Sequence, residues 1–305
     1  MYEQIVLIGE LRSGGKWLKS LFDPSHYMDL REFLSPLPQN GLTPEGHKSH
    51  VHAGHKLVDI LVPILKYSNI DQRLVSAIHD VLVSLEISNN GVMNSKFSNL
   101  EICDLVIKTM KQLNKGSIIK LLPSISTARF HSQHKRAKLH SQRMRELINH
   151  SDVCIKFYRK NILNLYISHM KSLISGCWSN KESQQNKVNK NLIQIIWDPD
   201  HYNKYYHNMV LSFYSLLKYH NNTTNTIMVS YEEIHESGMN ENQKLELIGG
   251  LINTVAPHIR IIPNDILYSE TKESKILDIQ DNFTNKEDFL ISQSKIQIYL
   301  PKTVY

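Results

Sequence analysis

Residues 4–22 read QIVLIGELRSGGKWLKSLF, and this stretch decides the fold. Ile5–Ile8 form a short apolar run that ends at Gly9, and the amphipathic sequence WLKSLF follows a glycine-containing turn. A short apolar run bounded by glycine is typical of a buried strand, and the apolar spacing after the turn is typical of a helix. The stretch therefore predicts a strand, a loop and a helix in succession.

Three further β-rich runs occur at Ser117–Leu122, Val153–Tyr158 and Thr226–Ser230. Helical patterns lie between the runs, at 56–67, 71–86, 99–113, 134–148, 162–177, 202–219 and 242–255. Strands that alternate with helices predict a mainly parallel sheet covered on both faces. Together with the loop after the first strand, this predicts a helix-rich α/β fold of the P-loop type.

The length and composition are those of a globular protein, with 305 residues, of which 41% are hydrophobic and 21% charged. We expect a single domain with a helical insertion at about residues 45–115. Residues 179–191 (SNKESQQNKVNKN) contain few apolar side chains. This segment is expected to be a mobile loop.

The net charge of +6 and the pI near 9.0 suit an anionic partner. The densest basic patch, at His131–Arg145, contains no aromatic residue, which disfavours nucleic acid as that partner. Cys103, Cys154 and Cys177 are widely spaced and form no CxxC pair, so neither a disulfide framework nor a cysteine zinc site is predicted. No apolar run reaches 18 residues, and we expect a cytosolic protein without a membrane span.

The segment Gly9–Trp17 lies between the first predicted strand and helix, where backbone N–H groups and a helix N-terminus can point at one anion. It departs from the GxxxxGK[ST] loop of nucleotide triphosphatases. Five residues lie between Gly9 and Gly15, where that loop has four, and Trp17 replaces the hydroxyl that binds magnesium. Magnesium-dependent phosphoryl transfer, as in a nucleotide kinase, is therefore the weaker alternative.

The sequence LRSGGKWL resembles the 5′-phosphosulfate loop of sulfotransferases that use 3′-phosphoadenosine 5′-phosphosulfate. The resemblance implies that Arg12 faces the bridging and sulfuryl oxygens of this donor, with no metal required. It also implies that the 5′-phosphate is cradled by Ser13, Gly14, Gly15, Lys16 and Trp17. Lys16 stands where the family often has threonine, and it adds a positive charge.

The segment Lys156–Trp178 resembles the 3′-phosphate region of the same family, in a form closest to bacterial carbohydrate sulfotransferases. Arg159 or Lys160 can be the principal phosphate cation, and we expect Arg159 and Ser168 to bind the phosphate with Lys160 assisting. A phosphate monoester suits this set because arginine offers a planar, bidentate fork. The alternative is that both cations only solvate a strand end and that Ser168 bonds to its own helix.

Two more segments extend the resemblance. Ile227–Ile234 (IMVSYEEI) resembles the strand followed by Tyr-Glu-[Asp/Glu]-Leu, in which we expect the tyrosine and the first glutamate to be structural. Residues 272–283 (KESKILDIQDNF) resemble the C-terminal pattern of these enzymes. That likeness implies that Lys272 and Lys275 close over the cofactor.

The residue that removes the acceptor proton is expected near the donor sulfur. Residues 29–33 (DLREF) resemble the Glu-[Tyr/Phe] segment of trehalose and nodulation-factor sulfotransferases, which makes Glu32 the candidate base. The alternative for Glu32 is a surface ion pair with Arg31 or another cation. Leu122 occupies the place of the histidine base of cytosolic small-molecule sulfotransferases, and nearby Lys120 is a candidate active-site cation.

A histidine cluster occupies residues 47–55 (GHKSHVHAGH is residues 46–55), but its spacing matches no standard zinc site. We expect it to form a lid or acceptor loop in which His50 or His52 contacts substrate. If Glu32 is not the base, these histidines and His131 are the alternatives.

The sequence thus predicts a metal-free sulfotransferase whose acceptor is a hydroxyl or amine of a carbohydrate or small natural product. A P-loop nucleotide kinase and a non-catalytic module that binds nucleotide or nucleic acid are the alternatives.

Overall fold

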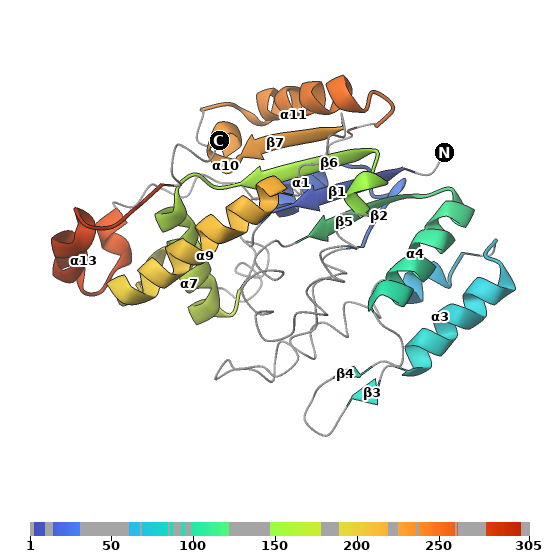
Figure 1. Cartoon of the computed structure of the whole chain (residues 1–305), viewed down its shortest axis with the longest axis horizontal. Helices are drawn as coiled ribbons and strands as arrows, with labels where there is room; N and C mark the ends of the chain where they lie inside the picture. The colour runs from blue at the N-terminus through green and yellow to red at the C-terminus, as the bar shows by residue number, and fades with distance from the viewer. Residues whose placement is uncertain are drawn as a thin grey trace.

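The computed structural model describes residues 3–9, 15–30, 61–67, 69–84, 86–87, 93–94, 99–121, 147–177, 189–218, 225–235, 238–259, 261 and 279–299. Its centre is a five-stranded sheet in the order β2-β5-β1-β6-β7 (Figure 1). The strands are β1 (Gln4–Ile8), β2 (Tyr27–Asp29), β5 (Gly116–Leu121), β6 (Val153–Tyr158) and β7 (Thr226–Ser230). All four neighbouring pairs are parallel, which confirms the predicted parallel sheet.

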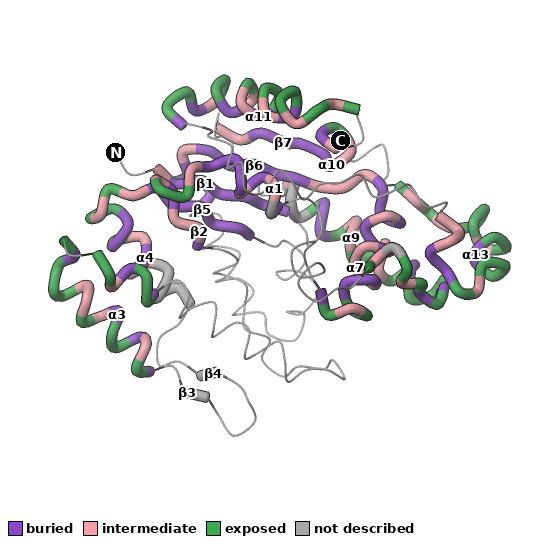
Figure 2. Tube along the Cα trace, turned by 180° about the vertical axis from the view of Figure 1, so that it is seen from behind, coloured by how far each residue is buried: buried purple, intermediate pink, exposed green. Residues whose placement is uncertain are grey.

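The central strands are apolar on both faces because helices cover both faces. Every residue of β1 and of β5 is buried (Figure 2). On one face, α1 (Gly15–Ser20) and α11 (Glu241–Val255) pack against Ile5, Leu7 and Ile155. Burial on both faces explains why apolar residues predominate in the strand sequences.

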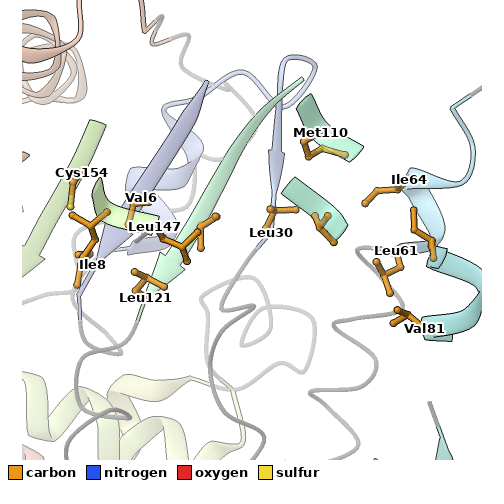
Figure 3. Packing of buried hydrophobic residues seen from close by; sticks show 14 of the residues in the cluster. Val6, Ile8, Leu30, Leu61, Ile64, Val81, Met110, Leu121, Leu147 and Cys154 are labelled. Carbon is orange, nitrogen blue, oxygen red and sulfur yellow. The ribbon is translucent and has the colours of Figure 1, made fainter. Parts of the chain in front are cut away.

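The opposite face is covered by α3 (Gln72–Ser84), α4 (Asn99–Leu113), α7 (Ile162–Ser175) and α9 (Pro199–Lys218). Figure 1 shows these four helices on the side of the sheet away from α11. Val6, Ile8 and Leu121 point toward them, and Figure 3 shows this layer with Met110 of α4 and Val81 of α3. The odd and even residues of β1 thus build two separate cores.

A third, largely aromatic cluster joins α7 and α9 to the C-terminal segment. That segment contains η2 (Ile279–Asn282) and α13 (Lys286–Gln293), and Ile195 forms a bridge with Phe283. The cluster includes Tyr166, Trp197, Tyr202, Phe283 and Phe289.

The observed elements follow the predicted ones closely where both can be compared. The predicted bounds of α4 coincide with those observed, and α3, α7, α9 and α11 begin and end close to their predicted limits. The short helix α10 (Tyr231–His235), α13 and the two-residue strands β3 (Glu86–Ile87) and β4 (Met93–Asn94) were not predicted.

Parts of the predicted pattern fall outside the described residues. The predicted helix at 134–148 is described only from 147, and the one at 56–67 only from 61. Of the predicted loop at 179–191, residues 189–191 are described, and η1 (Lys190–Leu192) begins there. In the described part of the chain, no helix is both long enough and apolar enough to cross a membrane.

Gly9 and Gly15 both lie against Phe157 of β6, so a larger residue at either position should lower the stability of the fold. A Cβ on Gly9 would overlap the Phe157 carbonyl oxygen, whereas one on Gly15 would meet side chains alone, 2.7 Å from Phe157 Cζ and 3.1 Å from Lys120 Cε. We expect Gly9→Ala to lower the free energy of unfolding by about 3 kcal/mol, measured by urea denaturation.

A double-mutant cycle provides the control. Phe157→Leu should relieve most of the Gly15→Ala penalty and little of the Gly9→Ala penalty, since a backbone atom cannot be trimmed. Unchanged stability in Gly9→Ala would contradict the described packing of β1 on β6.

Candidate anion-binding site at the carboxyl edge of the sheet

The strand order places a topological switch point between β1 and β6. The chain leaves β1 through α1 toward β2 on one side of the sheet, and it leaves β6 through α7 and α9 toward β7 on the other. Ligands of open parallel sheets bind outside the carboxyl ends of the strands at such a point. The two segments predicted to bind phosphate, 9–17 and 159–160, directly follow these two strands.

The start of α1 lies against β5 and β6. Gly15 is its first residue, and Lys120 from β5, which is buried, extends its side chain to that residue. The bare Cα of Gly15 therefore permits a cationic side chain and an aromatic ring to approach the helix start together. The backbone of Lys16 belongs to α1, but its side chain lies outside the described residues.

A row of side chains in contact with one another connects the two predicted halves of the site. Trp17 of α1 packs edge-on against His235, with ring centroids 5.0 Å apart, and its Nε1 donates to Glu241 Oε2 at 3.2 Å. His235 in turn packs on Tyr231 at 4.4 Å. The guanidinium carbon of Arg159 lies 3.7 Å from the Tyr231 ring centroid, which is cation–π geometry.

The environment of His235 keeps its imidazole neutral. Burial lowers its pKa to about 4, and the positive charges of Lys244 and Arg159 add to this effect while Glu241 opposes it. The sequence analysis missed this residue. Its position four residues after Tyr231 is the only signal for it, because the two side chains then share a helix face.

The two cations after β6 have different environments. Lys160 Nζ pairs with Glu233 Oε1 at 2.8 Å, so its charge is already balanced. Burial would raise the pKa of Glu233, but hydrogen bonds from Lys160 and Ser230 outweigh burial and lower it. Arg159 Nε is buried and has no hydrogen-bond partner among the described residues. This difference favours Arg159 as the principal ligand of an incoming anion.

Lys156 is a second residue that the sequence analysis did not select. It is fully buried in β6, paired in register with Ile8 at the end of β1. Burial lowers the pKa of its ammonium group and raises that of the Cys154 thiol to about 12. A lysine inside the otherwise apolar run VCIKFY is the signal that could have singled it out.

The remaining predicted residues divide into two groups. Ser168 lies in α7, about 9 Å along the axis from Ile162, so a phosphate must lie between this helix and the turn after β6 to meet both Ser168 and Arg159. The other predicted residues lie outside the described part of the chain: Arg12, Ser13, Gly14, Glu32, His50, His52, His131, Lys272 and Lys275.

No family model, curated protein or solved structure matches the chain.

The lowered pKa of His235 predicts a specific loss of stability in acid. Between pH 6.5 and about 4 the unfolded chain binds a proton at this residue that the folded chain does not. Stability should therefore be complete above pH 6.5 and fall as the pH drops toward 4, by at most about 3 kcal/mol.

His235→Phe keeps a ring between Trp17 and Tyr231 and removes the titration. Urea unfolding of both proteins across this pH range should show a stability difference that shifts in favour of the variant below pH 6.5. Parallel pH profiles for the two proteins would show that His235 titrates normally.

Proposed function

We propose that this protein is a sulfotransferase that binds 3′-phosphoadenosine 5′-phosphosulfate at the carboxyl edge of the sheet, between β1 and β6. One observation carries the proposal. Two segments assigned to phosphate binding from sequence alone follow the two strands that flank the switch point. The P-loop type of the sheet is part of the same proposal, since it depends on what the segment 9–17 binds.

The described contacts suit a ligand with two separate anionic groups. Gly15 and Lys120 lie at one end of the site, and Arg159 lies at the other, with the Trp17–His235–Tyr231 rings between them. In this proposal the first end binds the 5′-phosphosulfate and the second binds the 3′-phosphate. A guanidinium forms the shorter, charge-assisted hydrogen bonds that a phosphate monoester requires.

The proposed reaction is an in-line transfer. The acceptor oxygen or nitrogen forms a bond to sulfur while the bond between sulfur and the bridging oxygen breaks, and the nucleotide leaves with that oxygen as its 5′-phosphate. Arg12 and Lys120 would stabilise the charge that develops on the bridging oxygen. Glu32 would take the acceptor proton.

We propose a carbohydrate or small natural product as the acceptor, with His50 or His52 contacting it. The net charge of +6 favours the approach of the anionic donor.

Selective loss of the 3′-phosphate contact tests the nucleotide assignment. Arg159→Gln should weaken binding of 3′-phosphoadenosine 5′-phosphate by about 10- to 100-fold while changing adenosine 5′-monophosphate binding less than about twofold. Isothermal titration calorimetry of both nucleotides measures this.

Lys160→Gln is the matched control, because Lys160 is already paired with Glu233 and its loss should cost less. Equal losses for both nucleotides in Arg159→Gln would show that this arginine supports the fold and does not read the 3′-phosphate.

Turnover tests the predicted base. Glu32→Gln keeps the size of the side chain but cannot accept a proton, so sulfate transfer from labelled donor should fall by about 10²- to 10⁴-fold with donor affinity retained. An extract of the native host supplies the acceptors. Near-parental turnover in this variant would shift the base to His50, His52 or His131, or to a group of the acceptor itself.

A further inference from the structure

Glu232 of α10 binds the turn that leaves β6. Its Oε2 accepts the backbone N–H of Lys160 at 2.9 Å, and its Oε1 accepts that of Asn161 at 3.0 Å. One carboxylate therefore binds two successive backbone donors of a segment more than 70 positions away in the chain. The contact joins the carboxyl ends of β6 and β7, which are neighbours in the sheet.

The position of Glu232 is itself fixed by a capping box at the start of α10. Ser230 Oγ accepts the N–H of Glu233 at 3.2 Å, and Glu233 Oε2 accepts the N–H of Ser230 at 2.9 Å. Ser230 is fully buried at the end of β7. Glu232 lies within this reciprocal pair, so its carboxylate projects from a defined helix start that the sheet holds in place.

Four backbone donors between Lys160 and Asn164 are already bound by groups of the protein itself. Besides the two N–H groups bound by Glu232, that of Ile162 donates to the Ile298 carbonyl at 2.8 Å, and that of Asn164 donates to Asn161 Oδ1 at 2.9 Å. The N-terminus of α7 would otherwise attract anions. With these four donors occupied, an anion at the end of β6 depends mainly on side chains for its binding.

Arg159 is the side chain in position to bind it, and α10 holds that residue as well. Its guanidinium packs on Tyr231, the neighbour of Glu232 in sequence. The backbone just after Arg159 is thus held by Glu232, and its side chain is held by Tyr231. Both contacts come from one short helix, so α10 sets where the cation lies.

We propose that Glu232 is a positioning residue for the 3′-phosphate, acting as an internal anion that occupies the backbone N–H groups of Lys160 and Asn161 and holds Arg159 in place. This rests on the proposed function. The sequence analysis treated Glu232 as structural. In this role Glu232 makes the site selective for a nucleotide with a 3′-phosphate, because the phosphate then binds to the guanidinium of Arg159 and not to the N-terminus of α7.

The experiment compares the parent with Glu232→Gln, in which the neutral amide has one acceptor and turns a donor toward the second N–H. Amide hydrogen exchange of residues 160 and 161, without ligand, should be at least tenfold faster in the variant. By calorimetry, the preference for 3′-phosphoadenosine 5′-phosphate over adenosine 5′-monophosphate should fall at least tenfold, with adenosine 5′-monophosphate affinity within about twofold.

Glu233→Gln is the control. It also loses a carboxylate, but it frees Lys160, so the preference should stay equal or rise.

Two outcomes overturn the inference. Unchanged exchange of the two amides would show that Glu232 does not hold the turn. An equal loss of both nucleotides would show that its role is structural alone. A parent protein that does not prefer the nucleotide with the 3′-phosphate would instead overturn the proposed function, and this failure is distinguishable because it occurs without any substitution.

Discussion

The close approach of β6 to the chain segment after β1 is the constraint on which the site depends. Phe157 presents its carbonyl to Gly9 and its ring to both Gly9 and Gly15, and neither position has room for a side chain. Because the two glycines have no side chain, α1 can begin directly beside β6. The side chain of Lys120 extends from β5 to the first residue of α1. The contact of Phe157 with Gly9 and Gly15 therefore holds the carboxyl ends of β1 and β6 close together at the switch point.

At this edge of the sheet, two lysines are paired with carboxylates and one arginine packs on an aromatic ring. Glu233 balances Lys160, and Glu241 balances Lys244, with Nζ to Oε1 2.7 Å apart. Arg159 instead lies on an aromatic ring, which stabilises a cation without neutralising its charge. The proposed function assigns the anion to Arg159 for this reason, because a cation already paired to a carboxylate contributes little to a ligand.

Much of the sheet could be predicted from sequence because its strands are short apolar runs with clear ends. Three strands could be predicted without knowing which strands they pair with: Ile5–Ile8, Val153–Tyr158 and Thr226–Ser230. A strand of a parallel sheet that is covered on both faces is mostly apolar whatever its neighbours are. The segments predicted to bind phosphate could be singled out for a similar reason. Their residue types are local, and the parallel sheet brings the ends of the strands to one edge.

The contacts within the site could not be predicted in this way. The helix α10 has five residues, too few for a hydrophobic period, and its capping box is visible only once the helix is known. His235 matters because it meets Trp17, a neighbour through space that no spacing in the sequence reveals. Glu232 likewise acts on a turn from a different strand, so its role depends on the strand order.

A crystal structure of the protein with 3′-phosphoadenosine 5′-phosphate tests the central claim most directly. The account predicts that the nucleotide lies at the carboxyl ends of β1 and β6, with its 5′-phosphate at the start of α1 and its 3′-phosphate on the Arg159 guanidinium. A nucleotide bound at the amino ends of the strands, or away from the sheet, would contradict it. So would a complex whose 3′-phosphate makes no contact with the turn after β6.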